Sequence, residues 1–98
     1  MNKKNDAQLF TICKDVIYKT IDNDVFLLRP ENSTVHSLNT TASEIWSLLV
    51  ESDRSIAEIA KILSESYDAN LKDIKEDVRQ VITHLTKNNF IKSTKNKD

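Results

Sequence analysis

The spacing of apolar residues changes once along the chain, close to residue 40, and this change limits the folds open to it. Before that point the chain is strand-like. Residues 16–21 (VIYKTI) alternate, and residues 25–28 (VFLL) form the continuous apolar run typical of a central strand. Residues 34–38 (TVHSL) form a short segment that is more polar than the other two, which suits an edge strand. After residue 40 the spacing becomes helical, so the sequence predicts strands first and helices second.

Three segments after residue 40 carry apolar residues at the spacing of one helix face. Capping signals at residues 41–44 (TASE) and at Ser55 with Glu58 predict where the first two helices begin. Trp46 lies on the first stripe and is expected in the core. The stripe residues are Ala42, Ile45, Trp46 and Leu49, then Ile56, Ile59, Ala60 and Leu63, then Leu71, Ile74, Val78, Val81 and Leu85.

These elements predict an α+β fold in which a three-stranded antiparallel sheet is followed by three helices, an arrangement that is winged-helix-like. A chain of 98 residues is long enough for one domain with one core. We expect this domain to span residues 9–92, with the apolar pair at 90–91 folding back onto it. Residues 1–8 are expected to be a flexible N-terminus and residues 93–98 a flexible C-terminal tail.

The sequence contains no glycine, although tight turns and helix ends often need residues that tolerate positive φ. Asparagine and aspartate are the natural substitutes, so we expect turns at residues 22–24 (DND) and 31–32 (EN), and a helix end at residues 88–89 (NN). The absence of glycine also excludes glycine-rich phosphate-binding loops.

Composition excludes several classes of protein. The net charge is −1, from 14 basic and 15 acidic side chains, which argues against a nucleic-acid binder. No apolar run is long enough to span a bilayer, and the N-terminus lacks the apolar stretch of a signal peptide, so we expect a cytoplasmic protein with no membrane contact. Cys13 cannot form an internal disulfide and is interpreted as a small core residue. Without a Cys/His cluster, no metal and no cofactor is expected.

Catalytic chemistry is also not indicated. His36 lies on the predicted edge strand and His84 on the third helix, and neither is near a nucleophile motif. Both are interpreted as surface residues. Glu76 and Asp77 are adjacent, and neighbours on a helix point in different directions, so they do not form a two-carboxylate site. We therefore expect a protein that is not an enzyme.

Three stretches of the chain resemble the PqqD family, the recognition elements for leader peptides in pathways that modify ribosomally made peptides. They are VHSLNTTASEIWSLL, SIAEIAKILSESYD and DVRQVITHLTKNNFI, and the resemblance runs from about residue 16 to residue 91. Its specificity comes from the order and spacing of features that are individually ordinary. These features are Leu38-Asn39, Ile45-Trp46, Ile56-Ala57-Glu58, Asp77-Val78 and Leu85.

The resemblance implies a non-catalytic module that captures the leader segment of a precursor peptide. The leader would lie in a groove between the third strand and the third helix, pair as an additional strand and be presented to a maturation enzyme. That enzyme would be a radical SAM enzyme, a leader peptidase of a lasso-peptide system, or a cyclising or dehydrating enzyme. The sequence fits any of these partners.

The residues themselves favour the same mode of binding. An edge strand has unpaired backbone groups that an extended peptide can complete, and residues 33–38 contain neither the proline nor the lysine that often blocks such pairing. The same edge can also pair with a second copy, giving a homodimer. Val78, which we place in the peptide site, would fit a core position of the third helix equally well. The predicted peptide-binding residues are Ser33, Thr34, Val35, His36, Ser37 and Leu38 on the strand, with Lys75, Val78, Arg79 and Ile82 on the helix.

A DNA-binding winged-helix regulator is the second interpretation, because residues 55–68 followed by a long helix also suit a helix-turn-helix. Contact with phosphates favours an excess of positive charge, and the third helix has a near balance. It carries Lys72, Lys75, Arg79 and Lys87 against Asp73, Glu76 and Asp77. An enzyme subunit is the third and weakest interpretation.

Overall fold

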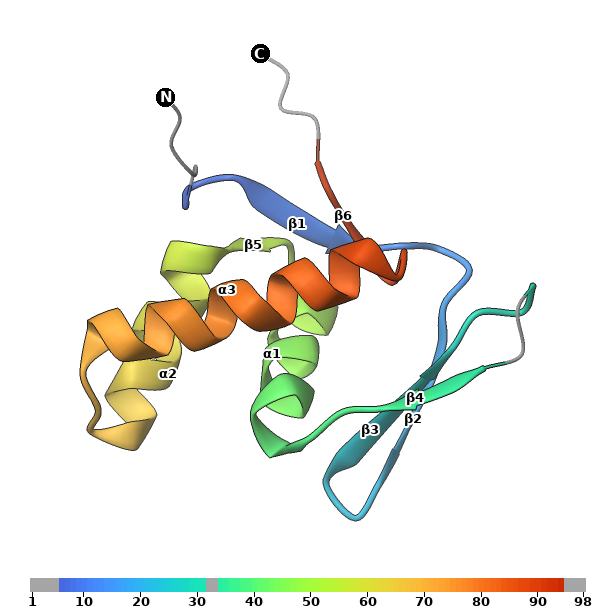
Figure 1. Ribbon diagram of the computed structural model, residues 1–98, viewed down its shortest axis with the longest axis horizontal. Helices are drawn as coiled ribbons and strands as arrows, with labels where there is room; N and C mark the ends of the chain where they lie inside the picture. Colours follow the sequence, from blue (N-terminus) through green and yellow to red (C-terminus); the bar gives the residue numbers. More distant parts are fainter. Residues whose placement is uncertain (1–5, 32–33, 95–98) are drawn as a thin grey trace.

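The computed structural model describes residues 6–31 and 34–94 (Figure 1). It confirms the predicted three-stranded antiparallel sheet and the three helices, and it adds a second small sheet. In chain order the elements are β1 (Leu9–Ile12), β2 (Ile17–Ile21), β3 (Asp24–Leu28), β4 (Val35–Ser37), α1 (Thr40–Glu51), β5 (Arg54–Ser55), α2 (Ile56–Tyr67), α3 (Leu71–Lys87) and β6 (Ile91–Ser93).

The first sheet has the strand order β2-β3-β4, so the predicted central and edge strands are confirmed. Val25 and Leu27 of β3 are buried, whereas the alternate residues Phe26 and Leu28 are only half-buried. One face of this sheet therefore packs on the core and the other faces outward. The predicted turn between β2 and β3 is confirmed, since Asp22 and Asn23 have φ of 52° and 74°.

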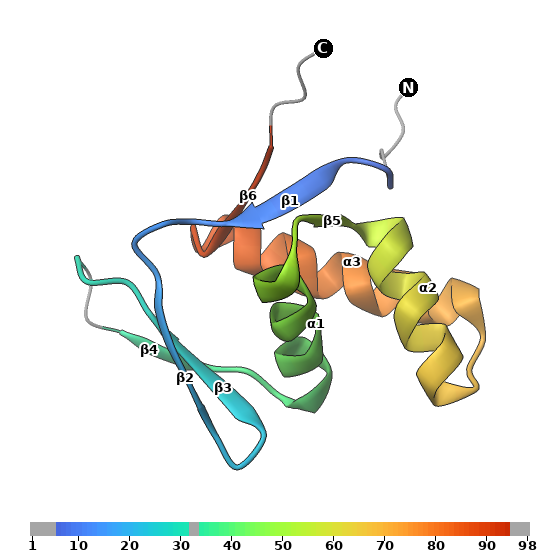
Figure 2. The same cartoon turned by 180° about the vertical axis from the view of Figure 1, so that it is seen from behind.

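The second sheet, with the order β5-β1-β6, was not predicted as a sheet (Figure 2). The apolar hook after α3 supplies β6, in which Ile91 pairs with Ile12 of β1. Contacts extend slightly beyond the predicted boundaries of 9–92. The Ala57 N–H donates to the carbonyl of Asp6 at 3.1 Å, and the Thr94 N–H donates to the carbonyl of Leu9 at 2.9 Å. The remaining parts of the predicted tails, 1–5 and 95–98, lie outside the described residues.

Caps define where the helices begin. The predicted capping box of α2 is confirmed, because Glu58 N–H donates to Ser55 Oγ at 3.1 Å and Ser55 N–H donates to the Glu58 carboxylate at 3.0 Å. The predicted box at residues 41–44 is wrong: the Asn39 side chain caps α1 by accepting from the Ala42 N–H at 2.8 Å. Glu44 instead accepts a hydrogen bond from the Tyr67 hydroxyl, and this bond raises the pKa of Tyr67.

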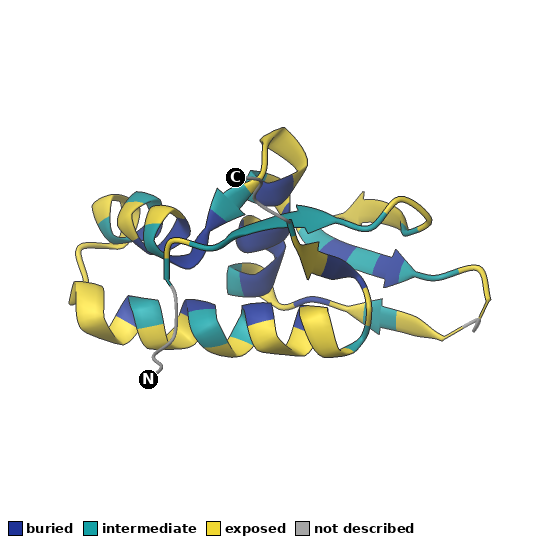
Figure 3. Cartoon of the chain, turned by 90° about the horizontal axis from the view of Figure 1, so that it is seen from above, coloured by how far each residue is buried: buried dark blue, intermediate teal, exposed yellow. Residues whose placement is uncertain are grey.

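A single core joins the helices to the inner face of the first sheet (Figure 3). Trp46 is buried there as predicted, with its ring edge-on to Tyr18 at a centroid distance of 5.6 Å. The long helix α3 buries one stripe, consisting of Ile74, Val78, Ile82 and Leu85. It ends at the predicted asparagine pair, where Asn89 has a φ of 64°. This stripe leaves two flanks of α3, one toward β4 and one toward β1.

Candidate functional site

The open edge of β4 carries backbone groups that no other described strand pairs with. Leu38, just after β4, donates its N–H to the carbonyl of Val25 at 2.8 Å. In an antiparallel pair, residues whose backbone groups face the partner alternate with residues whose groups face away. Because Leu38 faces β3, His36 faces it too. The N–H and C=O groups of Val35 and Ser37 therefore point to the open side, where an extended peptide can pair with them.

A buried serine fixes this edge to α1. The Val25 N–H donates to Ser43 Oγ at 2.9 Å, and the Ser43 hydroxyl donates to the carbonyl of Leu38 at 3.1 Å. Ser43 thus relays the hydrogen bond that would otherwise run directly between the two strands. Since an unpaired buried N–H is costly, this relay holds the end of β4 at a defined place beside the helix.

A groove of about 260 Å³ runs between the end of β4 and the adjoining flank of α3. The ring of His36 lies against Phe90, with centroids 4.9 Å apart, and 6.2 Å from the ring of His84. Side chains on the inner face of a peptide added to β4 would enter this groove. Its lining residues are Ser37, Leu38, Asn39 and Ala42 on one side, and Gln80, Val81, His84 and Leu85 on the other.

The structure brings together only part of the predicted strand residues. Val35 and Ser37 have both exposed side chains and outward backbone groups, and His36 turns its ring toward α3. Leu38 is buried, and its N–H is occupied by Val25. Thr34 precedes the strand and is exposed, and Ser33 lies outside the described residues.

The four helix residues predicted for the site lie elsewhere. Val78 and Ile82 are 0% and 2% exposed and belong to the core, and Ile82 also lines the cavity beneath β1. Lys75 and Arg79 lie toward the N-terminal segment, where Lys75 Nζ is 3.6 Å and Arg79 Nη2 is 2.9 Å from the Asp6 carboxylate. Neither cation lines the groove beside β4.

Sequence reasoning missed the part that Gln80, Val81 and His84 play in the groove. Val81 was assigned to the core stripe and His84 to the surface. The signal was present in the helical spacing, because these residues lie together on one side of the buried stripe. What the spacing could not show is which flank of the helix would face β4.

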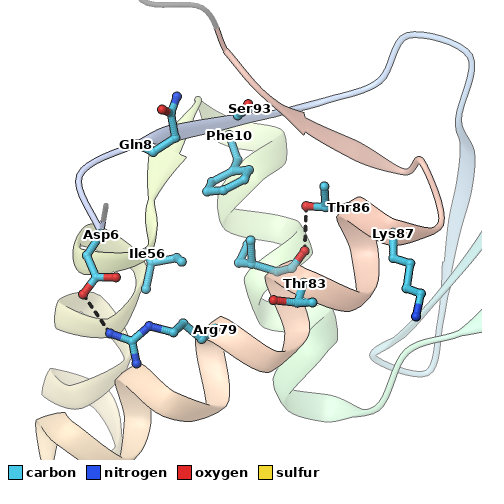
Figure 4. A pocket seen from close by; sticks show the side chains of 10 residues that line it. Asp6, Gln8, Phe10, Ile56, Arg79, Thr83, Thr86, Lys87 and Ser93 are labelled. Atoms are coloured by element: carbon cyan, nitrogen blue, oxygen red, sulfur yellow. Dashed lines mark hydrogen bonds and ion pairs between the residues drawn. The ribbon is translucent and has the colours of Figure 1, made fainter. Parts of the chain in front are cut away.

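The other flank of α3 borders a larger cavity, of about 650 Å³, beneath β1 (Figure 4). Phe10 and Ile56 form apolar walls, and Thr83 lies along the helix side. At one end of the cavity, Arg79 is held by Asp6 and by Glu76, the latter through Nη1 at 3.2 Å. The charge of Arg79 is thus paired within the protein.

An arginine links the loop after β3 to the end of α3. Arg29 Nη1 donates to the carbonyl of Asn89 at 2.7 Å, while its Nη2 donates to the Glu31 carboxylate at 2.6 Å. The hydrogen bonding from Arg29 lowers the pKa of Glu31 below its usual value. This link ties the hairpin that carries β4 to the turn that follows α3.

Two negative findings apply to the described part of the chain, residues 6–31 and 34–94. It contains no group of three or more His, Cys, Asp or Glu side chains placed to hold a metal ion. It also has no helix that combines the length and the apolar character needed to cross a membrane.

The fold and the site define a winged-helix-like α+β domain with one open strand edge beside its last helix. The family model described as Coenzyme PQQ synthesis protein D (PqqD) matches residues 24–91, well over half of the chain. The chain therefore belongs to the PqqD family, as its sequence resemblance predicted. The matched segment includes β4 and α3, the two walls of the groove. No curated protein matches the chain.

Solved structures agree on the fold. TbiB1, solved in complex with the TbiA(beta) leader peptide, is 26% identical, with a TM-score of 0.79 over 88% of this chain and 99% of that one. Lasso peptide synthetase B1, complexed with the leader peptide, is 24% identical, with a TM-score of 0.75 over 85% of this chain and 96% of that one. The PqqD truncation of Methylobacterium extorquens PqqCD, described as a functional and stand-alone RiPP recognition element, is 22% identical, with a TM-score of 0.71 over 86% and 88%.

Proposed function

We propose that this protein binds the leader segment of a ribosomally made precursor peptide by strand addition to β4. The observation that carries the proposal is the outward direction of the Val35 and Ser37 backbone groups, next to the groove of α3. Membership of the PqqD family supports it, as does the likeness to TbiB1, whose structure contains a leader peptide.

In this mode the leader's backbone supplies affinity and its side chains supply selectivity. Each net backbone hydrogen bond contributes about 0.5–1.5 kcal/mol whatever the leader's sequence. Alternate side chains of the added strand would enter the groove, where Val81 offers an apolar contact and the two histidines offer polar rings. We expect leaders with an apolar residue at the position facing Val81 to bind most tightly.

The protein itself would be non-catalytic and would present the bound leader to a modifying enzyme or leader peptidase in the cytoplasm. Binding to DNA is not supported. Two cations of α3 that would contact phosphates, Lys75 and Arg79, are held by Asp6, and the matched family and structures point to peptide recognition.

A pair of proline variants tests strand addition. Ser37→Pro removes an N–H from the open edge of β4 without breaking a bond to β3, so we expect leader affinity to fall at least about tenfold. Thr20→Pro is the matched control, because by the same alternation its N–H points away from β3 on the opposite edge of the sheet, at β2.

The measurement is fluorescence anisotropy with a labelled leader peptide, taken from a precursor gene identified in the genome that encodes this protein. Circular dichroism establishes that both variants keep the fold. Unchanged leader affinity in folded Ser37→Pro would contradict strand addition at β4, and so would an equal loss in both variants.

A further inference from the structure

The outward face of the sheet β2-β3-β4 is unusually apolar for a surface in contact with water. The strand register places side chains from all three strands on this side, opposite the buried Val25 and Leu27. An antiparallel sheet with one solvated face normally alternates apolar residues inward with polar residues outward. Here the outer face, as we call it, consists of Ile17, Lys19, Ile21, Phe26, Leu28 and Val35, with Asp24 at its hairpin end and Ser37 at its border.

Much of this surface is exposed in the part of the chain that the structure describes. Ile17, Ile21 and Val35 are 53%, 48% and 59% exposed, and none of the three helices covers this side of the sheet (Figures 1 and 2). They run across the sheet as a patch, because Ile17, Leu28 and Val35 are aligned in register. A contiguous exposed apolar patch of this kind marks an interaction surface.

We propose that the outer face is the docking surface for the maturation enzyme, and that a bound leader extends it. This inference rests on the proposed leader binding at β4. A strand added to β4 has its side chains alternately on the two sides of the sheet. One set enters the groove of α3, and the other set joins Val35 on the outer face. A partner seated there contacts this protein and the leader at once.

The continuity of this face with Val35 of β4, where the leader is proposed to pair, favours the enzyme that acts on the leader over a second copy of this chain. Lys19 lies between Ile17 and Ile21 on β2 and directly opposite Phe26, near the middle of the patch. Asp24 lies on the same face opposite Ile21, so the face carries one charge of each sign. An enzyme with an apolar patch and a carboxylate facing Lys19 fits this surface.

The test uses the full chain, the same labelled leader, and the purified maturation enzyme encoded in the gene cluster of that precursor. Ile17→Ser combined with Ile21→Ser should leave leader affinity within about twofold and weaken the enzyme's affinity for the leader-bound protein at least about tenfold. Lys19→Glu should produce a similar loss while altering only one surface charge, so it carries the test if the double variant does not fold.

Two exposed apolar residues away from the sheet provide matched controls. Val50→Ser and Leu71→Ser, at 44% and 47% exposure, should change neither affinity. The enzyme should also bind the leader-bound protein more tightly than the free protein, by about tenfold, because only the bound form has the extended face.

The outcomes separate this inference from the function on which it rests. If the leader does not bind the wild-type protein, the proposed function fails and this inference fails with it. Three results would overturn only the docking surface, provided that the leader binds every variant. The enzyme's affinity could be unchanged by the outer-face substitutions, it could be reduced equally by the control substitutions, or it could be the same with and without bound leader. A wild-type dimer that Ile21→Ser converts to monomers in sedimentation equilibrium would assign the face to a second copy and overturn it too.

Discussion

Along α3, the flank toward β4 and the flank toward β1 differ in charge as well as in shape. The β1 flank carries Lys75 and Arg79, both held by Asp6, and borders the larger cavity. The β4 flank presents Val81 and His84 to an open strand edge across a smaller groove. If the leader binds as proposed, neither the conspicuous charges nor the larger cavity marks the peptide site. The proposed site is marked by backbone groups of β4 with which no other described strand pairs, next to a mostly uncharged helix surface.

The two flanks of α3 should differ most in their effect on leader affinity when an aspartate is placed on each of them in separate variants. Val81→Asp puts a charge into the groove wall where the leader's inner side chains would pack, so leader affinity should fall at least about tenfold, equivalent to about 1.4 kcal/mol. Thr83→Asp, two residues further along on the β1 flank, should leave affinity within about twofold. Isothermal titration with the leader peptide measures both.

Equal losses in the two variants would remove the distinction between the flanks, and a loss confined to Thr83→Asp would move the peptide site to the cavity beneath β1. Both side chains are at least partly exposed, so thermal unfolding should show both proteins folded.

The local pattern of the sequence predicted much of this architecture. Strand β3 was recognisable because an apolar run is typical of a central strand, and the turn at Asp22 and Asn23 because few residues other than glycine tolerate positive φ. The second sheet could not be read in this way. Strand β5 has only two residues and β6 only three, and their partner β1 lies far away in the sequence. Such pairing depends on the packed fold.

The sequence analysis predicted the strand wall of the groove beside β4, but the four helix residues it named do not line that groove. The helical period identified the stripe of α3 that contains Val78 and Ile82, and this stripe is the core. The period of a single helix does not specify which flank of the stripe will face β4, because that depends on how the helix crosses the sheet. The attraction between Lys75, Arg79 and Asp6 was similarly hidden, since Asp6 lies in a segment with no regular pattern.

The second prediction concerns this ion-paired flank. The sequence alone led us to expect that Arg79→Glu weakens binding of an acidic leader. With Arg79 placed beside Asp6 and Glu76, we expect instead a small loss of stability, about 0.5–1 kcal/mol, because the variant brings three carboxylates together. Leader affinity should stay within about twofold.

Urea unfolding and fluorescence anisotropy on the same preparation distinguish the two expectations. The matched control is Arg79→Gln, which removes the ion pairs without adding a negative charge and should lose less stability. A large loss of leader affinity in both variants would restore Arg79 to the peptide site.

The smallest expected effect concerns the ion pair between Arg29 and Glu31. Glu31 has its pKa lowered by hydrogen bonding from Arg29, so its contribution to stability is present above its ordinary pKa of 4.5 and is lost as the pH falls through the lowered value. Glu31→Gln should therefore lower Tm slightly at pH 7 and have no effect at a pH below the lowered value. Glu65→Gln, an exposed residue of α2, is the control. If Glu31→Gln lowered Tm equally at both pH values, the carboxylate's charge would not be what holds Arg29 in place, and the contact between Arg29 and the carbonyl of Asn89 would have to link the β4 hairpin to the end of α3 by itself.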